Sequence, residues 1–454
     1  MKSMKKFAIL VLLGAIVATA ANADIPVVQH VVIIVQENRT PDNLFHGLPA
    51  LLPGADIADS GPNSKGQTIR LTAVALANTY DLSHRHSAFQ DMYDNGRLDG
   101  ADLLKCKENN GSHCPPNSQF KYVNPADVAP YFYLATHYGF ANRMFQSNQG
   151  PSLPAHQFIL GGTSQPTATS LFFASDNPTG NANANGCDAK SATRIKLVGP
   201  NRMKSSMYPC FEHATLTDLI DSPPKGARQG ITWRYYTPSE GSIWTAPEGI
   251  RHMCIPGGNP PTCKGPDWTN GKISLNPAQV LTDIQTGKLA SVSWVIPTIQ
   301  ESDHASSNDG SGPSWVASVV NEIGSSTYWN STVILIVWDD WGGWYDHVPP
   351  PIDTKYGYYE NGFRVPLLVV SPYTPVGYVS RTTHTFVSIL KFIETAYGLP
   401  LIAPGTYVDS RADDLSDFFN FSKPPRPFQT VPAALDRTFF LNDHRPLTGP
   451  DSDQ

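Results

Sequence analysis

Two pairs of neighbouring residues with oxygen-bearing side chains closely follow strongly apolar segments. The four residues are Glu37, Asn38, Asp339 and Asp340. The apolar segments before them are residues 27–35 and 333–338. Adjacent carboxylates repel one another unless a cation or a bound proton relieves the repulsion. Hard divalent cations prefer carboxylate and amide oxygens as ligands. We therefore predict that the four side chains bind one divalent metal ion, whose identity the residue types do not fix.

An alternative interpretation treats the two pairs as ordinary polar strand ends. Glu37 and Asp340 would then cap a helix or a turn, because Asp and Asn are common in turns. Two such pairs after two apolar runs favour the metal site over this alternative. Gly342 and Gly343 support it further, because glycine lets the backbone approach a ligand closely.

Ser152 is the candidate nucleophile. Pro154 fits the first position of a helix and Gly161 fits the position just past its end, which places Ser152 at or just before the helix N-terminus. The free N–H groups and the dipole there favour an anionic oxygen and a phosphoryl group. A serine hydroxyl needs activation, and metal coordination supplies it. The alternative is that Ser152 only caps the helix.

Three of the 13 histidines are candidates for contacting phosphate or protonating a leaving group. They are His84, His304 and His347. Each lies near a carboxylate in the sequence, and a carboxylate neighbour raises the pKa of a histidine into a range useful for acid catalysis. We predict that Ser152, His304 and His84 are catalytic and that Asn38, His84 and His347 bind substrate. A structural or solvated role is the alternative for each histidine.

The apolar runs that precede these residues have the length and composition of buried parallel strands. They span residues 27–35, 291–296, 333–338 and 365–370, and helical patterns span 125–138, 314–323 and 385–397. This alternation predicts an α/β fold, a doubly wound and mostly parallel sheet with helices on both faces. Ligands bind beyond the carboxyl ends of strands in such sheets. The pairs Glu37-Asn38 and Asp339-Asp340, here called the acidic pairs, would therefore meet at one edge of the sheet.

The first 23 residues have the features of an export signal. Lysines precede an apolar core at 7–17, and Ala-Asn-Ala at 21–23 fits the cleavage rule. We expect a mature chain of residues 24–454, forming one domain in the periplasm or outside the cell, with no membrane-spanning segment. A retained N-terminal anchor is the alternative. We interpret residues 164–276 mostly as an insertion or cap, and residues 410–454 as a surface-wrapping tail.

The six cysteines predict disulfides, because an exported chain meets an oxidising compartment. Pairing nearest neighbours gives Cys106–Cys114, Cys187–Cys210 and Cys254–Cys263, one of fifteen pairings that six cysteines allow. The absence of a C-x-x-C pair in the sequence disfavours a zinc site made of these cysteines. The net charge of −6 and the lack of a basic run argue against nucleic acid as a main partner.

Together, these motifs resemble those of the bacterial phosphoesterase family that contains secreted acid phosphatases and phosphatidylcholine-type phospholipases C. The matching segments are residues 30–47, 81–84, 150–162, 301–304, 337–350 and 364–372. The resemblance implies an alkaline-phosphatase-like fold, a metal at the two acidic pairs, a nucleophile at Ser152 and phosphate contacts at His84 and His304. One departure is Ala155-His156, where many family members have Asn-Arg.

The resemblance implies an exported, metal-dependent phosphoesterase that forms a phosphoserine. Its substrate would be a small phosphorylated molecule or a phospholipid head group. A sulfatase is one alternative, since residues 152–154 partly match a sulfatase signature, although His156 stands where that signature has arginine. A non-catalytic exported protein that binds a metal or another ligand is another. Tryptophans near the acidic pairs fit either a choline cage or the core; they are Trp294, Trp338, Trp341 and Trp344.

Overall fold

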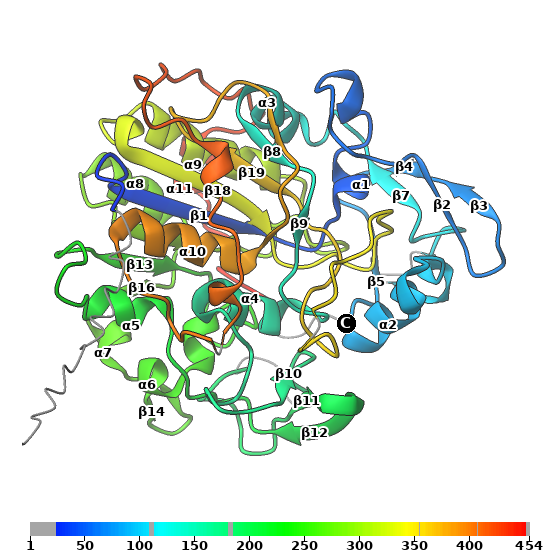
Figure 1. The fold of residues 1–454 in the computed structure, drawn as a ribbon, viewed down its shortest axis with the longest axis horizontal. Coiled ribbons are helices and arrows are strands. Elements are labelled where there is room, and N and C mark those ends of the chain that lie inside the picture. Colours follow the sequence, from blue (N-terminus) through cyan, green and yellow to red (C-terminus); the bar gives the residue numbers. More distant parts are fainter. Residues whose placement is uncertain (1–23, 109–112, 180–184, 354, 406, 451–454) are drawn as a thin grey trace, which may run out of the picture.

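A computed structural model of the chain describes residues 24–108, 113–179, 185–353, 355–405 and 407–450. An eight-stranded sheet lies at the centre of the described residues (Figure 1). In spatial order its strands are β16 (Ile273–Ser274), β13 (Trp233–Tyr236), β17 (Val292–Val295), β1 (His30–Gln36), β18 (Thr332–Trp338), β19 (Leu367–Val370), β8 (Gly139–Ala141) and β20 (Tyr378–Ser380). The predicted export signal at 1–23 lies outside the described residues.

The middle of the sheet is parallel and buried on both faces. β1 pairs in parallel with β17 on one side and with β18 on the other. Every residue of β18 is buried, as is every residue of β1 after its first. Runs of Val, Ile and Leu suit this position, because neither face of the strand meets water. The predicted α/β fold with a mostly parallel sheet is confirmed.

The parallel direction predicted for the strand at 365–370 is wrong. β19 runs antiparallel to both β18 and β8. Its last residues therefore lie at the opposite edge of the sheet from the end of β18. Ser371, which follows β19, donates a hydrogen bond to the carbonyl of Thr332 at the start of β18 (3.1 Å). An antiparallel strand buried on both faces has the same apolar composition as a parallel one, so the residue pattern did not reveal its direction.

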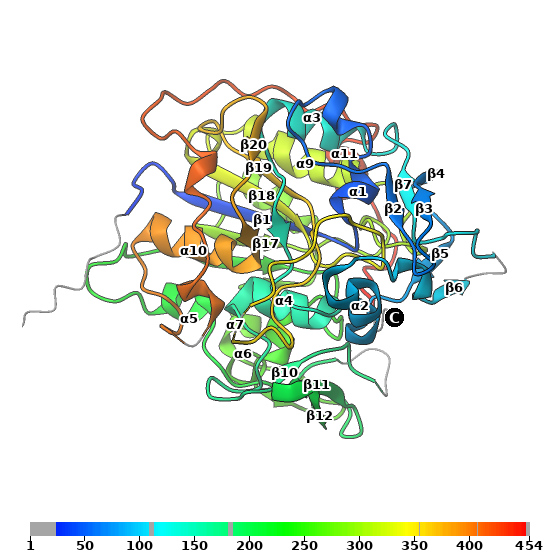
Figure 2. The ribbon, with the colours of Figure 1, turned by 45° about the vertical axis from the view of Figure 1, so that its right-hand side comes forward.

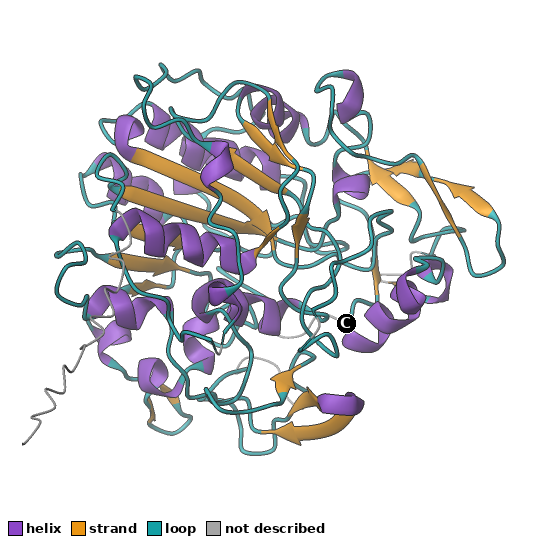
Figure 3. Cartoon of the chain, viewed as in Figure 1, coloured by secondary structure: helices purple, strands orange, loops and turns teal. Residues whose placement is uncertain are grey.

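Helices cover both faces of the sheet. α4 packs on α10 and on α5, whereas α9 packs on α3, α8 and α11. Figures 1 and 2 show these two groups on opposite sides of the strands, and Figure 3 shows the sheet between them. The helices are α1 (Pro41–Leu44), α2 (His86–Tyr93), α3 (Ala129–His137), α4 (Ser152–Gly161), α5 (Leu216–Asp221), α6 (Arg251–Cys254), α7 (Pro266–Thr269), α8 (Gln279–Gln285), α9 (Gly312–Gly324), α10 (Phe386–Tyr397) and α11 (Arg437–Leu441).

The range 164–276 contributes to the main sheet as well as to a peripheral layer. Strands β13 and β16 extend the sheet beyond β17, so the interpretation of this range as a cap outside the sheet is wrong for these two strands. They are short, and β13 mixes aromatic and basic residues, so the residue pattern did not predict either strand. The predicted disulfide pairing is confirmed: Cys106–Cys114, Cys187–Cys210 and Cys254–Cys263.

Smaller sheets surround the main one. Their paired strands are β10 (Phe173–Ala174), β11 (Ile195–Gly199) and β12 (Met203–Met207); β2 (Ser60–Pro62) and β3 (Thr68–Arg70); β4 (Thr72–Val74) and β7 (Lys121–Val123); β5 (Tyr80–Leu82) and β6 (Cys106–Glu108); β9 (Met144–Phe145) and β21 (His384–Thr385); β14 (Pro256–Gly257) and β15 (Thr262–Cys263).

The C-terminal tail packs along the outside of the helices. Phe428 contacts Trp329, and Phe440 on α11 contacts Trp315 on α9. Both contacts are edge-to-face, an arrangement that aromatic pairs prefer. Across the described residues, no helix combines the length and apolar character that crossing a membrane requires.

Candidate active site

The two acidic pairs lie side by side at the carboxyl ends of β1 and β18. The strands are in register up to their last residues, Gln36 and Trp338. The backbone N–H of Asn38 donates to Asp339 Oδ1 (3.0 Å), and the N–H of Asp339 donates to the carbonyl of Gln36 (2.9 Å). The N–H of Asp340 donates to the same Asp339 Oδ1 (2.7 Å). The structure therefore brings together all four predicted metal ligands, and all four are buried.

The two glycines after the Asp pair are required by the fold of the turn. Gly342 has a φ of +61° and Gly343 a φ of +75°, both in the left-handed region. A Cβ on Gly342 would lie 2.3 Å from the carbonyl oxygen of Asn38. The sequence analysis attributed these glycines to the approach of a ligand, but at Gly342 the close approach is to the backbone of the other pair. The turn also orients Asp340, whose Oδ1 accepts from the N–H of Gly342 (2.7 Å).

Ser152 is the first residue of α4 and points at the acidic pairs. Its Oγ donates a hydrogen bond to Asp340 Oδ2 (3.2 Å). Extended Pro151 stands at the cap position, and the helix ends where Gly162 has a φ of +73°. The predicted start at Pro154 was therefore two residues late, although Ser152 still lies at the helix N-terminus. Because Ser152 lies inside the helix, it does not act as its N-cap.

His84 and His304 approach the same place from two loops. The Nδ1–H of His84 donates to the carbonyl of Leu82 (2.7 Å), which leaves Nε2 to accept from Asn38 Nδ2 (3.4 Å). His304 Nδ1 makes a similar bond to the carbonyl of Ala305 (2.8 Å). The two imidazole rings are 6.3 Å apart, centre to centre. These hydrogen bonds favour one tautomer, with Nε2 as the reactive nitrogen, in each ring.

His347 lies in a separate network of charged side chains. Its Nδ1 is 2.8 Å from Asp42 Oδ2, and its Nε2 is 3.1 Å from Asp56 Oδ1. Buried Arg364 joins the network through Asp346 and Asp42. Burial alone would lower the pKa of His347, but the hydrogen bond and charge of Asp42 raise it. These contacts hold the loop after the Asp pair, and a contact of His347 with substrate stays a prediction.

His156 is a site residue that the sequence analysis missed. It lies on α4, one turn after Ser152, and its imidazole is buried. Its Nε2 lies 3.5 Å from Glu37 Oε1 and 3.8 Å from Asp339 Oδ2. The spacing of four residues from Ser152 was the available signal, because residues i and i+4 share one face of a helix.

The comparison with known protein families fits this arrangement. The sequence model of the Phosphoesterase family matches residues 28–400, which is most of the chain and includes every residue described above. This chain belongs to the phosphoesterase family.

Curated relatives of this chain include several bacterial phospholipases C. Non-hemolytic phospholipase C of Pseudomonas aeruginosa is 24% identical over 92% of this chain and 61% of the relative. Hemolytic phospholipase C of the same organism is 24% identical over 87% of this chain and 56% of the relative. Phospholipase C A of Mycobacterium tuberculosis is 29% identical over 33% of each chain. The chain thus spans less than two thirds of the length of each of these relatives.

A solved structure also matches over much of the chain. It is a protein in the alkaline phosphatase superfamily from Vibrio parahaemolyticus, with a TM-score of 0.35 and 10% identity, covering 83% of this chain and 74% of that one. A TM-score of this size carries no argument about the fold.

The side chains around the two acidic pairs fit a divalent metal. Glu37, His156 and Asp339 each offer one ligand atom, and these atoms lie within 4.8 Å of one another. Asn38 Oδ1 is buried and accepts no hydrogen bond from the part of the chain that the structure describes. Buried carboxylates and an unsatisfied amide oxygen are costly without a compensating cation. The metal itself stays a prediction.

A second network of buried groups holds His304 in place. Asp303 Oδ2 accepts from Tyr131 Oη (3.0 Å) and from Trp338 Nε1 (2.9 Å). Buried Arg39 donates from Nε to the carbonyl of Asp303 (2.9 Å). Burial raises the pKa of Asp303 to about 6, although Arg39 and the two hydrogen bonds act in the opposite direction. Sequence reasoning did not find these partners, because three distant segments supply them.

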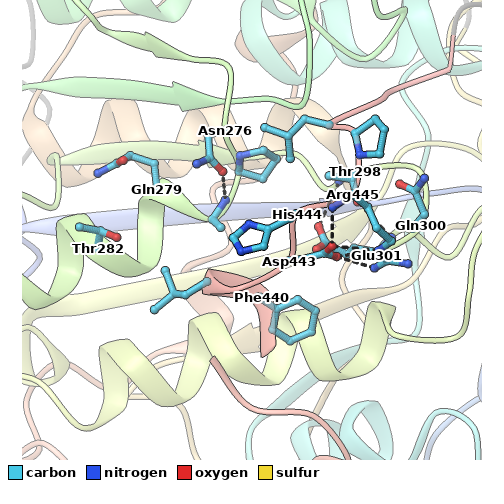
Figure 4. A pocket seen from close by; sticks show the side chains of 15 residues that line it. Asn276, Gln279, Thr282, Thr298, Gln300, Glu301, Phe440, Asp443, His444 and Arg445 are labelled. Atoms are coloured by element: carbon cyan, nitrogen blue, oxygen red, sulfur yellow. Dashed lines mark hydrogen bonds and ion pairs between the residues drawn. The ribbon is translucent and has the colours of Figure 1, made fainter. Parts of the chain in front are cut away.

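A pocket of about 410 Å³ lies behind the loop that carries His304. Glu301 lines it together with residues of α8 and of the C-terminal tail (Figure 4). Asp443 and Arg445 form an ion pair within it. None of the predicted catalytic or metal-binding residues lines this pocket. We therefore place the candidate active site at the acidic pairs and not here.

Proposed function

We propose that the protein is an exported, metal-dependent hydrolase of phosphate esters that acts through a phosphoserine at residue 152. The observation that carries the proposal is the contact of Ser152 Oγ with Asp340 Oδ2 at the N-terminus of α4. The buried carboxylates of the two acidic pairs lie beside this contact, and His84, with His304 next to it, reaches Asn38. Membership of the phosphoesterase family supports the reaction class.

In the first half of the reaction, Ser152 Oγ attacks phosphorus in line with the departing alcohol. The Oγ–P bond forms while the bond from phosphorus to the alcohol oxygen breaks. Asp340 Oδ2, which accepts the hydrogen bond of the Ser152 hydroxyl, takes up its proton as the Oγ–P bond forms. In its doubly protonated form, His304 or His84 gives the Nε2 proton to the departing alcohol. The N-terminus of α4 and the amide of Asn38 favour the charge on the phosphoryl oxygens.

In the second half, water attacks phosphorus and the Oγ–P bond breaks. The histidine that lost its proton takes one from the water, and Asp340 returns its proton to Ser152 Oγ. Inorganic phosphate or a phosphomonoester leaves, according to the substrate. A divalent cation held by Glu37, Asn38, Asp339 and Asp340 would activate the hydroxyl and neutralise phosphoryl charge when bound.

The names of the relatives favour a phospholipid head group as substrate, but the chain spans less than two thirds of their length. Purified mature protein should therefore be tested on p-nitrophenyl phosphate and p-nitrophenyl phosphorylcholine, with and without chelator. Turnover of the first alone indicates a phosphatase, and turnover of the second indicates a phospholipase C. Turnover of p-nitrophenyl sulfate only would indicate a sulfatase. Failure on all three with metal restored would favour a binding protein and contradict the proposal.

Ser152→Ala tests the covalent step. We expect the rate to fall by at least about a thousandfold, since a nucleophile has no substitute in this mechanism. Acid quenching of the wild type during turnover should trap a phosphorylated peptide that contains residue 152. Ser164→Ala is a matched control, because Ser164 is also buried but donates to the carbonyl of Ala174 (3.0 Å). Full activity in Ser152→Ala would exclude the phosphoserine.

A further inference from the structure

We infer that His156 is a nitrogen ligand of the metal site and makes this chain selective for metals that accept imidazole. The inference rests on the proposed function only in taking the cluster around Glu37 and Asp339 as a metal site. It adds a ligand that neither the sequence motifs nor the acidic pairs supply.

α4 delivers His156 to the cluster together with Ser152. The two residues are four apart on one helix, so both side chains project from the same face. Ser152 contacts Asp340, and His156 Nε2 lies between Glu37 and Asp339. One helix face thus meets both acidic pairs, and no side chain in this group is exposed.

The separations match those of ligands around a metal. Zinc binds nitrogen at about 2.0–2.1 Å and oxygen at about 2.0–2.2 Å, which places neighbouring ligand atoms roughly 3.0–3.5 Å apart. His156 Nε2 lies 3.5 Å from Glu37 Oε1 and 3.8 Å from Asp339 Oδ2, within a few tenths of an ångström of that range.

Two other histidines of the described chain each have a contact with a carboxylate at hydrogen-bond length. His347 Nδ1 is 2.8 Å from Asp42, and His384 Nδ1 is 2.7 Å from Asp413. Charge-assisted hydrogen bonds have such lengths. The spacing around His156 is wider than these two contacts and leaves room for an ion between the three side chains.

The chemistry of the donor set then determines which metal is preferred. Sites made of carboxylate and amide oxygens suit Mg²⁺, Ca²⁺ and Mn²⁺, whereas imidazole suits Zn²⁺, Fe²⁺, Ni²⁺ and Cu²⁺. A neutral imidazole adds a ligand without adding charge. Glu37, Asp339 and Asp340 then supply the negative charge that a divalent ion needs. We expect Zn²⁺ and Co²⁺ to bind more tightly than Mg²⁺ or Ca²⁺.

Metal titration of the stripped protein tests the inference without using activity. Calorimetry with Zn²⁺ and Mg²⁺, and visible absorption with Co²⁺, should be compared for the wild type and His156→Gln. Loss of a ligand should weaken Zn²⁺ and Co²⁺ binding at least tenfold and alter the Co²⁺ spectrum. Mg²⁺ binding should change less. His156→Cys should restore Zn²⁺ affinity, because thiolate is also a zinc ligand.

His213→Gln is the matched control, because His213 is buried and donates to a backbone carbonyl away from the cluster. It should bind metals as the wild type does, and circular dichroism should show every variant folded. Wild-type Zn²⁺ and Co²⁺ affinities in His156→Gln, tighter binding there, or no Zn²⁺ or Co²⁺ binding by the wild type would overturn the inference. The first two results would leave the proposed hydrolase intact. Conversely, if metal binding depends on His156 but the protein turns over no phosphoester, only the proposed hydrolase function is contradicted.

Discussion

Gly342→Ala should damage the active site much more than its stability cost suggests. The new Cβ would lie 2.3 Å from the carbonyl oxygen of Asn38, and φ at this position is +61°. A left-handed alanine costs about 1–2 kcal/mol, of which the lower entropy of the unfolded chain offsets roughly 0.4–1 kcal/mol. Relieving the overlap adds about 1–3 kcal/mol. We therefore expect a loss of about 1–5 kcal/mol in the free energy of unfolding.

The expected loss of activity follows from the direction in which the Asn38 backbone would move. Moving the backbone of Asn38 away from the turn separates the two acidic pairs, and a displacement of about 1 Å can cost a hundredfold in rate. We expect phosphoester turnover and metal affinity to fall together by about that factor. Urea unfolding, initial rates and metal titration measure the three quantities separately.

Gly271→Ala is the matched control for the stability cost of an alanine with a left-handed backbone. Gly271 has a φ of +72°, and a Cβ there would meet no atom within 4 Å. This variant should lose only about 0–1.5 kcal/mol and keep full activity and metal binding, because only the left-handed backbone is penalised. If the two variants lost the same stability and Gly342→Ala kept its activity, the close packing of the turn on Asn38 would not matter to the site.

Two further predictions concern buried carboxyl groups. Burial and then the neighbouring Asp409 raise the pKa of Glu394 from 4.5 to about 9. Folded Glu394 thus keeps a proton that the unfolded chain releases, so its contribution to stability is present at low pH and is lost as pH rises from about 4.5 to about 9. Glu394→Gln should flatten this fall in melting temperature, and parallel curves for the two proteins would contradict it. Asp303→Asn should cost about 1–3 kcal/mol by weakening the hydrogen bonds that Tyr131 and Trp338 donate to the carboxylate, and should lower kcat more than it changes KM. Urea unfolding and steady-state kinetics check this, and an unchanged kcat would refute the positioning role.

The central strands and the polar residues at their ends were predictable from the sequence because these features are local. Long runs of β-branched residues mark strands buried on both faces, and the oxygen-bearing side chains come directly after those runs. The disulfide pairing was also local, since each bridge joins neighbouring cysteines. The direction of β19 was not predictable, because an apolar run has the same composition in either direction.

Contacts between distant segments were beyond sequence reasoning for a different reason. His156 was interpreted only as a departure from a family pattern, since nothing near it in sequence carries an acidic group. Its partners Glu37 and Asp339 reach it from two separate strands. Likewise, the peptide of Asp303 is held by Arg39 from one side and its carboxylate by Tyr131 from another. Only the assembled sheet places such residues together.

The register between β1 and β18 controls the chemistry at their ends. His30 lies opposite Thr332 at one end of the pairing, and Gln36 lies opposite Trp338 at the other. A slip of one residue would turn every side chain to the other face of the sheet. Glu37 would then point away from α4, and Asn38 would lose the position from which it reaches His84. Buried Val, Ile and Leu residues on both faces oppose such a slip, so side chains that never meet substrate determine which oxygens face Ser152.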